Sequence, residues 1–504
     1  MTSAIFRKVL WLAVCSLPAP AEVKPSALFS DHAVLQAGAP VPVWGVAAPG
    51  EKVTVSLNGQ SQSATASADG KWVVRLNPLK PGGPFQMTIA GQNTVLVNDV
   101  LVGEVWLGSG QSNMVFTVSK KRTPWAGTLN EEQEIAEANY PQIRMFTGKS
   151  AKTYEPQNEI VGEWQISNPE NVPGFSAIGY FFARDLQKEI HEPVGILTLA
   201  YGASTAEAWI RRETLVADPL LKPLVDRFDT AVRFYRENPS APADQAPRPP
   251  QTINGRPGAA RPGRQRDPVQ DQHYPTVLFN GMIHPVVPYA IRGVLWYQGE
   301  SVLDGDQGVL LYPHVQATLV KDWRKLWGQA DLPFFVVQLA ALEDISNNPR
   351  VREGQASVLS LPNSGLAVTI DIGDPKNVHP PNKQAVGERL TRLALAKVYG
   401  RDIEYSGPVY ESMQVVGSAI QLKFSHLGGG LAAKGGPLKW FTVAGADRKF
   451  IPAEARIEGD TVVVSNAQLT MPLAVRYAWE NYPEGCNLYN AAGLPAAPFR
   501  TDTW

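Results

Sequence analysis

Between about residues 101 and 400, short apolar runs alternate with stretches of helical periodicity, and this alternation constrains the fold more than any other feature. Parallel strands that are buried on both faces read as continuous apolar runs, and a crossover helix joins each to the next. The region therefore predicts an α/β domain with a mostly parallel sheet covered by helices on both faces. The candidate strands are EVWLGS (104–109), PVGILTLA (193–200), IRGVLWYQ (291–298), PFFVVQLA (333–340) and GLAVTIDI (365–372), and the candidate helices are 176–190, with Ser176 as N-cap, and 387–400.

The segments on either side of this region have the pattern of β-structure. Residues 22–100 contain short alternating runs such as KVTVSLNG and WVVRLN, separated by turn residues, and this is typical of a β-sandwich domain. Residues 401–504 return to such runs and predict a C-terminal β-rich domain. Residues 237–273 are rich in Pro, Arg, Gln and Gly with few apolar side chains, so they predict a surface insertion without a core of its own.

The first 21 residues have the pattern of a secretory signal peptide. Arg7 and Lys8 precede an apolar run, and Ala19-Pro20-Ala21 fits a small-x-small cleavage site. The apolar run is too short to cross a bilayer, so we expect a secreted or periplasmic protein, with a lipid anchor on Cys15 as an open alternative. Cleavage after Ala21 leaves Cys486 as the remaining cysteine, which excludes an intrachain disulfide and a cysteine metal cluster.

The charge balance narrows the possible partners. The formal net charge of the 504-residue chain is −1, and this favours neither a nucleic acid nor an anionic membrane surface as a partner. The oligomeric state is not indicated by any pattern in the sequence.

Residues that could take part in chemistry, through a side chain or a backbone N–H, follow the predicted strands where each strand ends. Ser112 follows the first strand, Gly202 the second, Gln298 and Glu300 the third, and His379 the last. Ligands gather at the carboxyl ends of parallel strands, so these loops are expected to meet at one edge of the sheet. A hydroxyl, backbone donors, an imidazole and a carboxylate are the groups that acyl transfer needs. His284 also precedes a proline but follows no predicted strand, so His379 is the preferred base.

Three motifs carry a family resemblance. GQSNM (110–114), WYQGES (296–301) and DIGDPKNVHPPNK (371–383) together resemble the sialate O-acetylesterase-like branch of the SGNH hydrolases. The resemblance extends over nearly the whole mature chain, through DHAVLQ (31–36), FSAIGYFFAR (175–184), LFNGMIHP (278–285) and NLYNAAGLPAAPFRTD (487–502). It implies a flavodoxin-like three-layer α/β/α sandwich and a carboxylic ester hydrolase that removes O-acetyl groups from sugars with no metal and no cofactor.

Position by position, the resemblance implies the catalytic groups. It implies Ser112 as the nucleophile, His379 as the general base, and an oxyanion hole formed by the Ser112 and Gly202 N–H groups and the Gln298 amide. The triad acid is open, because Lys376 stands three residues before His379, where many relatives have Asp. Glu300 is the favoured acid, by similarity to acetyl xylan esterases with a Gln-Gly-Glu block, and Asp374 is the alternative.

The expected substrate is an O-acetylated sugar. An O-acetyl sialic acid is the first expectation, and acetylated xylan, xyloglucan or another plant glycan is the close alternative. Gln111, Asn113 and Trp209 are candidate substrate-binding residues, while Arg211 and Arg212 are candidates for binding a sugar carboxylate. A hypothesis from another class is a secreted carbohydrate-binding protein whose α/β domain has lost its activity.

Overall fold

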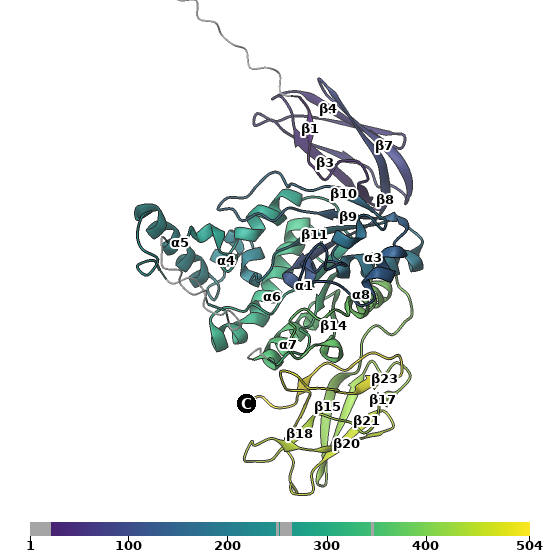
Figure 1. The fold of residues 1–504 in the computed structure, drawn as a ribbon, viewed down its shortest axis with the longest axis vertical. Helices are drawn as coiled ribbons and strands as arrows, with labels where there is room; N and C mark the ends of the chain where they lie inside the picture. The colour runs from purple at the N-terminus through teal and green to yellow at the C-terminus, as the bar shows by residue number, and fades with distance from the viewer. Residues whose placement is uncertain (1–21, 248–250, 253–264, 344–346) are drawn as a thin grey trace, which may run out of the picture.

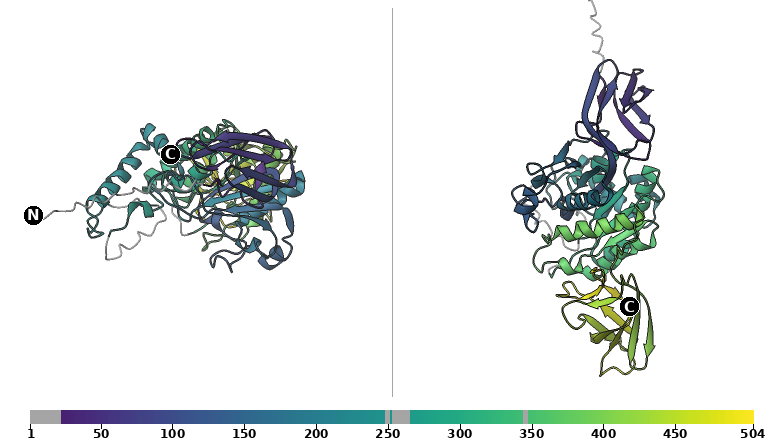
Figure 2. Two further views of the ribbon diagram at one scale, coloured as in Figure 1. Left: turned by 90° about the horizontal axis from the view of Figure 1, so that it is seen from above. Right: turned by 90° about the vertical axis from the view of Figure 1, so that its right-hand side faces the viewer.

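The structure is a computed structural model, and it describes residues 22–247, 251–252, 265–343 and 347–504. Three regions follow one another along its longest axis in chain order: N-terminal sheets, a central region of strands and helices, and C-terminal sheets (Figure 1). The right-hand view of Figure 2 shows the same order, and in Figure 1 helix α5 (Lys222–Glu237) projects to one side of the central region. The predicted signal peptide lies outside the described residues.

The central sheet contains the five predicted strands and two more. Its order is β10-β9-β11-β8-β12-β13-β14, and each neighbouring pair is parallel except β10 with β9. The prediction of a mostly parallel sheet is therefore confirmed, with a mixed edge that the apolar runs did not indicate. The strands are β8 (Thr94–Gly110), β9 (Tyr140–Thr147), β10 (Trp164–Ser167), β11 (Val194–Ala200), β12 (Gly293–Tyr297), β13 (Phe334–Val337) and β14 (Ser364–Ala367).

Helices cover both faces of this sheet, as two neighbouring phenylalanines of β13 demonstrate. Successive side chains of a strand point to opposite faces. Phe335 stacks on Trp106 of β8, which packs against Phe182 of helix α3 (Ala177–Ile190). Phe334 instead contacts Trp323 of helix α6 (Gly305–Trp327) on the other face. Large aromatic side chains thus fill the two interfaces between sheet and helices.

Helix α3 begins where the sequence predicted. The Ser176 Oγ accepts the Gly179 N–H and caps the helix, which confirms the N-cap prediction. Helix α8 (Lys383–Lys397) starts four residues before its predicted beginning, because Asn382 caps it by accepting the Ala385 N–H. The remaining α-helices are α1 (Ser112–Val115), α2 (Glu131–Ala136), α4 (Arg212–Ala217) and α7 (Asn348–Ala356).

Strand β8 crosses the expected boundary between residues 100 and 101 without a break. Its first half pairs antiparallel with β7, and its second half lies at the centre of the α/β sheet between β11 and β12. The short strand β2 (Val34–Gln36) also pairs with it, in parallel. The N-terminal region and the central sheet therefore share one continuous strand, which ends at the candidate nucleophile.

The terminal regions consist of strands, as predicted from their alternating runs. In the N-terminal region these are β1 (Lys24–Pro25), β3 (Val41–Val46), β4 (Lys52–Leu57), β5 (Gln60–Thr65), β6 (Lys71–Leu76) and β7 (Gly82–Ala90). In the C-terminal region they are β15 (Val409–Val416), β16 (Ala419–Ser425), β17 (Leu431–Ala433), β18 (Phe441–Ala444), β19 (Ile451–Pro452), β20 (Glu454–Glu458), β21 (Thr461–Ser465), β22 (Ala474–Tyr477), β23 (Leu488–Asn490) and β24 (Phe499–Arg500).

A buried arginine fastens the C-terminal region to the central one. Arg352 of α7 donates to the carbonyls of Leu339 and Ala340 in the central region and to those of Glu480 and Asn481 in the C-terminal region. Each of the three guanidinium nitrogens thus donates to a carbonyl oxygen, so the buried group needs no carboxylate partner. The loop before β23 is therefore held against the α/β domain.

The predicted insertion, residues 237–273, packs against the rest of the protein at its C-terminal end. Residues 248–250 and 253–264 lie outside the described part of the chain. The end of the segment packs against the protein, because Gln265 and Val269 are buried and the Tyr154 hydroxyl donates to Asp267. The end of the predicted insertion, residues 265–273, therefore packs against the core of the α/β region, while the prediction that the segment has no core of its own stays a prediction.

Candidate active site

The candidate nucleophile lies where β8 ends at the carboxyl edge of the sheet. Gly110 has φ +126°, and a Cβ at this position would lie 2.1 Å from the Tyr297 carbonyl oxygen of β12, so no larger residue fits. The next residue, Gln111, donates its N–H to the same carbonyl at 2.9 Å. This close approach ends the strand and turns the chain into α1, whose first residue is Ser112.

Ser112 and His379 are in direct contact, as predicted. The distance from Ser112 Oγ to His379 Nε2 is 2.8 Å, although 267 positions separate the two residues in the chain. Burial and the nearby Lys383 charge lower the pKa of His379 to about 4. The imidazole is therefore neutral at neutral pH and able to accept the serine proton. His284, the rival histidine, instead bonds the Gln157 carbonyl through Nδ1.

The glycine loop after β11 lies beside the serine. A Cβ at Gly202 would lie 3.8 Å from the Ser112 Cβ, and Tyr201 donates its N–H to the Gly110 carbonyl. The loop and the nucleophile turn are therefore neighbours at the same edge. Since the first N–H groups of a helix have no partner within the helix, the Ser112 N–H also belongs to the backbone donors of this edge.

The Gln298 side chain has a different place from the one predicted. Its Nε2 donates to the carbonyls of Ser204 at 3.2 Å and Ser301 at 2.9 Å, and its Oε1 accepts the Tyr312 hydroxyl at 2.9 Å. Both amide hydrogens are thus directed at backbone carbonyls, and the residue is fully buried. In this conformation Gln298 has no side-chain N–H for an oxyanion, and it supports the glycine loop instead.

A buried polar cluster lies behind the Ser112–His379 pair. The Asn113 Nδ2 donates to Glu300 Oε1 at 2.5 Å and to the Val378 carbonyl at 3.1 Å, and its Oδ1 accepts the Lys383 ammonium at 2.6 Å. Burial raises the pKa of Glu300, against the opposing effects of the Asn113 hydrogen bond and the Lys383 charge. Burial also lowers the pKa of Lys383 to about 7, which the Glu300 charge opposes.

The two aspartates upstream of His379 serve the loop and the fold. The Asp374 Oδ1 accepts the N–H groups of Lys376 and Asn377, and no hydrogen bond among the described residues joins it to the His379 ring. Asp371 forms a two-point ion pair with Arg389 of α8 and also accepts the Tyr489 hydroxyl. Glu300 is therefore the predicted acid that reaches the site, through Asn113.

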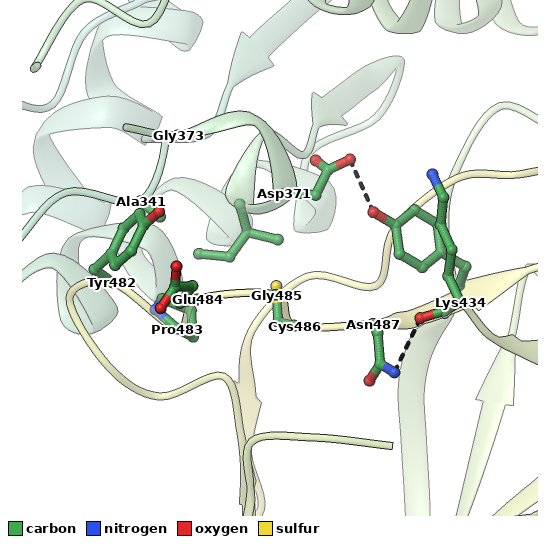
Figure 3. A pocket seen from close by; sticks show the side chains of 12 residues that line it. Ala341, Asp371, Gly373, Lys434, Tyr482, Pro483, Glu484, Gly485, Cys486 and Asn487 are labelled. Carbon is green, nitrogen blue, oxygen red and sulfur yellow. Dashed lines mark hydrogen bonds between the residues drawn. The ribbon is translucent and has the colours of Figure 1, made fainter. Parts of the chain in front are cut away.

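The Asp371–Tyr489 bond lies in a cavity between the central and C-terminal regions (Figure 3). The cavity has a volume of about 210 Å³ and is lined by Asp371, Lys434, Tyr482, Cys486 and other residues of both regions. Burial raises the pKa of the Cys486 thiol to about 11, so the thiol is protonated at neutral pH. The cavity is a seam between two regions, distinct from the site at Ser112.

Three predicted substrate-binding residues are part of the framework instead. Gln111, Asn113 and Trp209 are at most 2% exposed, so none of them presents a surface to a ligand. Trp209 donates its indole N–H to Ser204 Oγ and packs edge-on against Trp296 of the core. The prediction that these three residues bind the sugar is contradicted by their burial.

Arg211 and Arg212, the predicted carboxylate ligands, already have partners. Arg211 donates to the buried Asp322 of α6, and Arg212 pairs with Asp229 of α5. Both guanidinium groups therefore hold helices together.

Two residues of the site were missed in the sequence. Trp125 lies against His379 with ring centroids 4.4 Å apart, and it is 43% exposed. The sequence pattern that could have indicated Trp125 is a tryptophan in a segment after GQSNM that has neither helical nor strand periodicity. Lys383 is the last residue of the motif DIGDPKNVHPPNK. Its burial could not be predicted because it depends on α8 beginning at this residue.

No helix among the described residues is long and apolar enough to cross a membrane. No group of three or more His, Cys, Asp or Glu residues in the described part of the chain is placed to hold a metal ion.

Comparisons with known proteins find relatives over most of this chain. A family model described as carbohydrate esterase, sialic acid-specific acetylesterase, matches residues 102–236 and 272–396. The sialate O-acetylesterase of Mus musculus is 30% identical over 520 residues, covering 91% of this chain and 90% of the mouse protein. The human sialate O-acetylesterase is 29% identical over 512 residues, covering 91% of this chain and 88% of its own.

A solved structure is similar over nearly the full length. The crystal structure of a carbohydrate acetylesterase from Xanthomonas citri is 35% identical in sequence, with a TM-score of 0.81, and the match covers 96% of this chain and 100% of the other. The similarity includes the regions on both sides of the central sheet.

Proposed function

We propose that Ser112 and His379 carry the chemistry of this chain, which belongs to the carbohydrate esterase family of sialic acid-specific acetylesterases and is a carboxylic ester hydrolase. The observation that carries this proposal is the 2.8 Å contact between Ser112 Oγ and His379 Nε2 at the carboxyl edge of the sheet. A serine hydroxyl is a weak nucleophile until an adjacent base removes its proton.

The proposed reaction proceeds through an acetyl-serine. His379 Nε2 takes the Ser112 proton while Oγ bonds to the acetyl carbon. The ester bond to the sugar then breaks, and the imidazolium returns the proton to the sugar oxygen as it leaves. Water gives a proton to His379 and attacks the acetyl-serine, and acetate leaves as Ser112 regains its proton. The balance is one ester and one water consumed for one sugar hydroxyl and one acetic acid.

The oxyanion is proposed to meet backbone donors. The Ser112 N–H and the Gly202 N–H belong to adjacent loops, as the 3.8 Å distance from a Cβ at Gly202 to the Ser112 Cβ supports. Donors fixed in this way stabilise the negative oxygen without reorganisation. Gln298 contributes by holding the Ser204 carbonyl, and so the shape of the glycine loop.

Glu300 is proposed as the acid of the site. Its Oε1 accepts from Asn113, whose amide also bonds the Val378 carbonyl next to His379. Its negative charge favours the imidazolium that forms during proton transfer. Asp374 is the weaker alternative, because its carboxylate already accepts two N–H groups of its own loop.

The proposed substrate is an O-acetyl sialic acid, and the loop after α1 supports this choice. Residues 117–128 form a closed loop, because Gly127 and Thr128 donate N–H groups to Thr117 and Val118. Its tip carries Trp125 on the face of His379 and the exposed residues 120–122, which are Lys-Lys-Arg. An aromatic ring packs on a sugar face, and cations pair with a sugar carboxylate. These cations take the place of Arg211 and Arg212 in the proposal.

An acetylated plant glycan such as xylan or xyloglucan is the second candidate. The exposed Trp125 favours it equally, since an aromatic platform accepts a neutral sugar as well. The three cations are the feature that separates the two substrate classes, because a neutral glycan gains nothing from them.

Further features of the fold and of secretion complete the proposal. We propose that the central region is the three-layer α/β/α sandwich of SGNH hydrolases, residues 101–400, and that residues 22–100 and 401–504 are accessory β domains. We also propose that residues 1–21 are cleaved as a signal peptide and that the protein is secreted or periplasmic.

Acetate release from three matched substrates tests the function. The wild type is expected to release acetate from O-acetyl sialic acid faster than from acetylated xylan or xyloglucan oligosaccharides, and Ser112→Ala is expected to release none. Mass spectrometry of the quenched enzyme is expected to find 42 Da, about the mass of one acetyl group, added to the Ser112 peptide. A wild type without turnover on any substrate or on p-nitrophenyl acetate would favour an inactive carbohydrate-binding protein.

A further inference from the structure

Lys383 is a fully buried lysine directly behind the candidate active site. It is the first residue of α8, its side chain is 0% exposed, and its Nζ lies 4.5 Å from the centroid of the Phe116 ring. Its hydrogen bond at 2.6 Å goes to a neutral amide oxygen, Asn113 Oδ1, rather than to a carboxylate. Lysines are almost never fully buried, since the loss of hydration is costly, so a position like this one calls for a reason.

The reason lies in what the ammonium does to the Asn113 side chain. A lysine ammonium only donates hydrogen bonds, so the amide oxygen of Asn113 has to face it. The amide nitrogen then has to face the opposite way, where it meets two acceptors, Glu300 Oε1 and the Val378 carbonyl. With the amide reversed, its single oxygen would face the oxygens of Glu300 and Val378, and its NH2 group would face the Lys383 ammonium, donor against donor.

The oriented amide connects the two reacting residues from behind. Asn113 follows Ser112 in the chain, and Val378 precedes His379. The 3.1 Å bond from Asn113 to the Val378 carbonyl therefore joins the nucleophile turn to the histidine loop, one residue away from each reacting atom. The second bond, to Glu300, joins both to the loop after β12.

We propose that Lys383 is a positioning residue that fixes the orientation of the Asn113 amide, and that this amide holds Ser112 Oγ and His379 Nε2 at reacting distance. The inference rests on the proposed function for its kinetic consequences. Its structural part, the position and charge environment of the His379 ring, stands apart from any substrate.

The charges around His379 have identified sources. Lys383 of α8 lowers the pKa of the imidazole, together with burial. Glu300 is linked to the same segment through Asn113, Asp374 is bound within its own loop, and Lys376 is exposed. Removal of the Lys383 charge is therefore expected to raise the pKa of His379.

Lys383→Met and Lys383→Gln separate the two contributions of the residue. Methionine fills the space without a donor or a charge, whereas glutamine keeps an N–H donor for Asn113 without the charge. In Lys383→Met, kcat is expected to fall by about 10²-fold with KM within about threefold, because misplaced reacting groups lower the rate rather than binding. Lys383→Gln is expected to recover at least about tenfold in kcat.

The matched control is Lys397→Met at the other end of α8. Lys397 is partly buried, and like Lys383 it lies over an aromatic ring, with its Nζ 4.9 Å from the centroid of Tyr405. It has no contact with the site. This variant is expected to keep the wild-type kcat and pH profile. Thermal unfolding of each variant is recorded alongside, so that loss of the fold is separated from loss of positioning.

An NMR titration of the His379 imidazole in full-length protein completes the test, since it needs no substrate. The pKa of His379 is expected to be near 4 in the wild type and higher in Lys383→Met and Lys383→Gln, because both variants remove the Lys383 charge. If the wild type hydrolyses no ester, the proposed function fails; the inference then stands if a crystal structure of Lys383→Met shows the Asn113 amide reversed and the distance from Ser112 Oγ to His379 Nε2 longer than 2.8 Å. If Lys383→Met keeps wild-type kcat and titration, or loses kcat only in step with unfolding, the inference is overturned.

Discussion

Trp125 covers one face of the His379 imidazole, with ring centroids 4.4 Å apart and planes inclined by 35°. The Nε2 atom at the edge of the same ring meets Ser112 Oγ, so the imidazole contacts an aromatic ring on one face and the serine hydroxyl at its edge. Because 43% of the tryptophan surface is exposed, one side chain both shields the imidazole from water and faces the solvent, where we propose that a sugar binds.

Trp125→Ala is expected to weaken substrate binding and to raise the pKa of His379. Water reaches the exposed ring, and burial is the largest cause of its low pKa. We expect KM to rise about tenfold and the acid limb of kcat/KM to move upward by about one pH unit. Trp440→Ala, which removes a 38% exposed tryptophan of the C-terminal region, is the control and is expected to change neither value. An unchanged KM in Trp125→Ala would contradict the sugar-facing role.

The pH profile follows from the His379 pKa of about 4. The base acts only when neutral, so kcat/KM is expected to fall as the pH drops through about 4 and to stay level from pH 5 to neutrality. Because the ring binds fewer protons in the native state than in the unfolded state between about pH 4 and 6.5, this group also makes the fold less stable as the pH falls through that window. An acid limb near 6.5 would refute the predicted value.

Removal of either reacting group is expected to abolish turnover. Ser112→Ala and His379→Ala should each lower kcat by roughly 10⁴- to 10⁶-fold, since the two act as a unit, and the double variant should be no worse than either alone. His284→Ala is the matched histidine control and is expected to keep the wild-type kcat. Additive losses in the double variant would argue against a Ser–His pair.

Gln298→Ala separates a structural role from oxyanion stabilisation. The amide holds two buried backbone carbonyls, so its loss is expected to cost about 1–3 kcal/mol of stability and to lower the unfolding midpoint by several degrees. An oxyanion donor would instead lower kcat by about 10²–10³-fold with the unfolding midpoint unchanged. Differential scanning calorimetry and steady-state kinetics on the same preparations distinguish the two outcomes.

Glu300→Gln and Asp374→Asn are expected to differ in their effect on kcat. Glu300→Gln removes the negative charge behind the site and should lower kcat by about 10²-fold or more. Asp374→Asn keeps an oxygen for the Lys376 and Asn377 N–H groups and should change kcat by less than about threefold. The reverse order of effects would make Asp374 the acid of the site.

The sequence predicted the arrangement of the sheet because long-range pairing follows from local patterns. Continuous apolar runs marked β11, β12 and β13, and loops after parallel strands meet at one edge by geometry, so Ser112 and His379 were expected to meet there. Strands β9 and β10 were missed because YPQIRMFT and WQIS mix polar with apolar residues and do not read as continuous apolar runs.

Burial was the part that patterns could not supply. Trp209 and Asn113 follow strand ends, as binding residues do, but tertiary packing turned both side chains inward. The partners of Gln298 depend on Tyr312 of α6, and no spacing in the sequence places that hydroxyl against the amide. The position of Trp125 against His379 likewise depends on tertiary structure, namely on the closure of the loop 117–128.

Strand β8 makes the first hundred residues inseparable from the chemistry. Cutting the chain at residue 100 would divide β8 itself. Residues 101–103 would lose their partners in β2 and β7, and their backbone N–H and C=O groups would be left as an unpaired edge. The N-terminal region therefore pairs with and stabilises the strand that leads to Ser112. A chain without this region is expected to have a less stable central sheet at that strand.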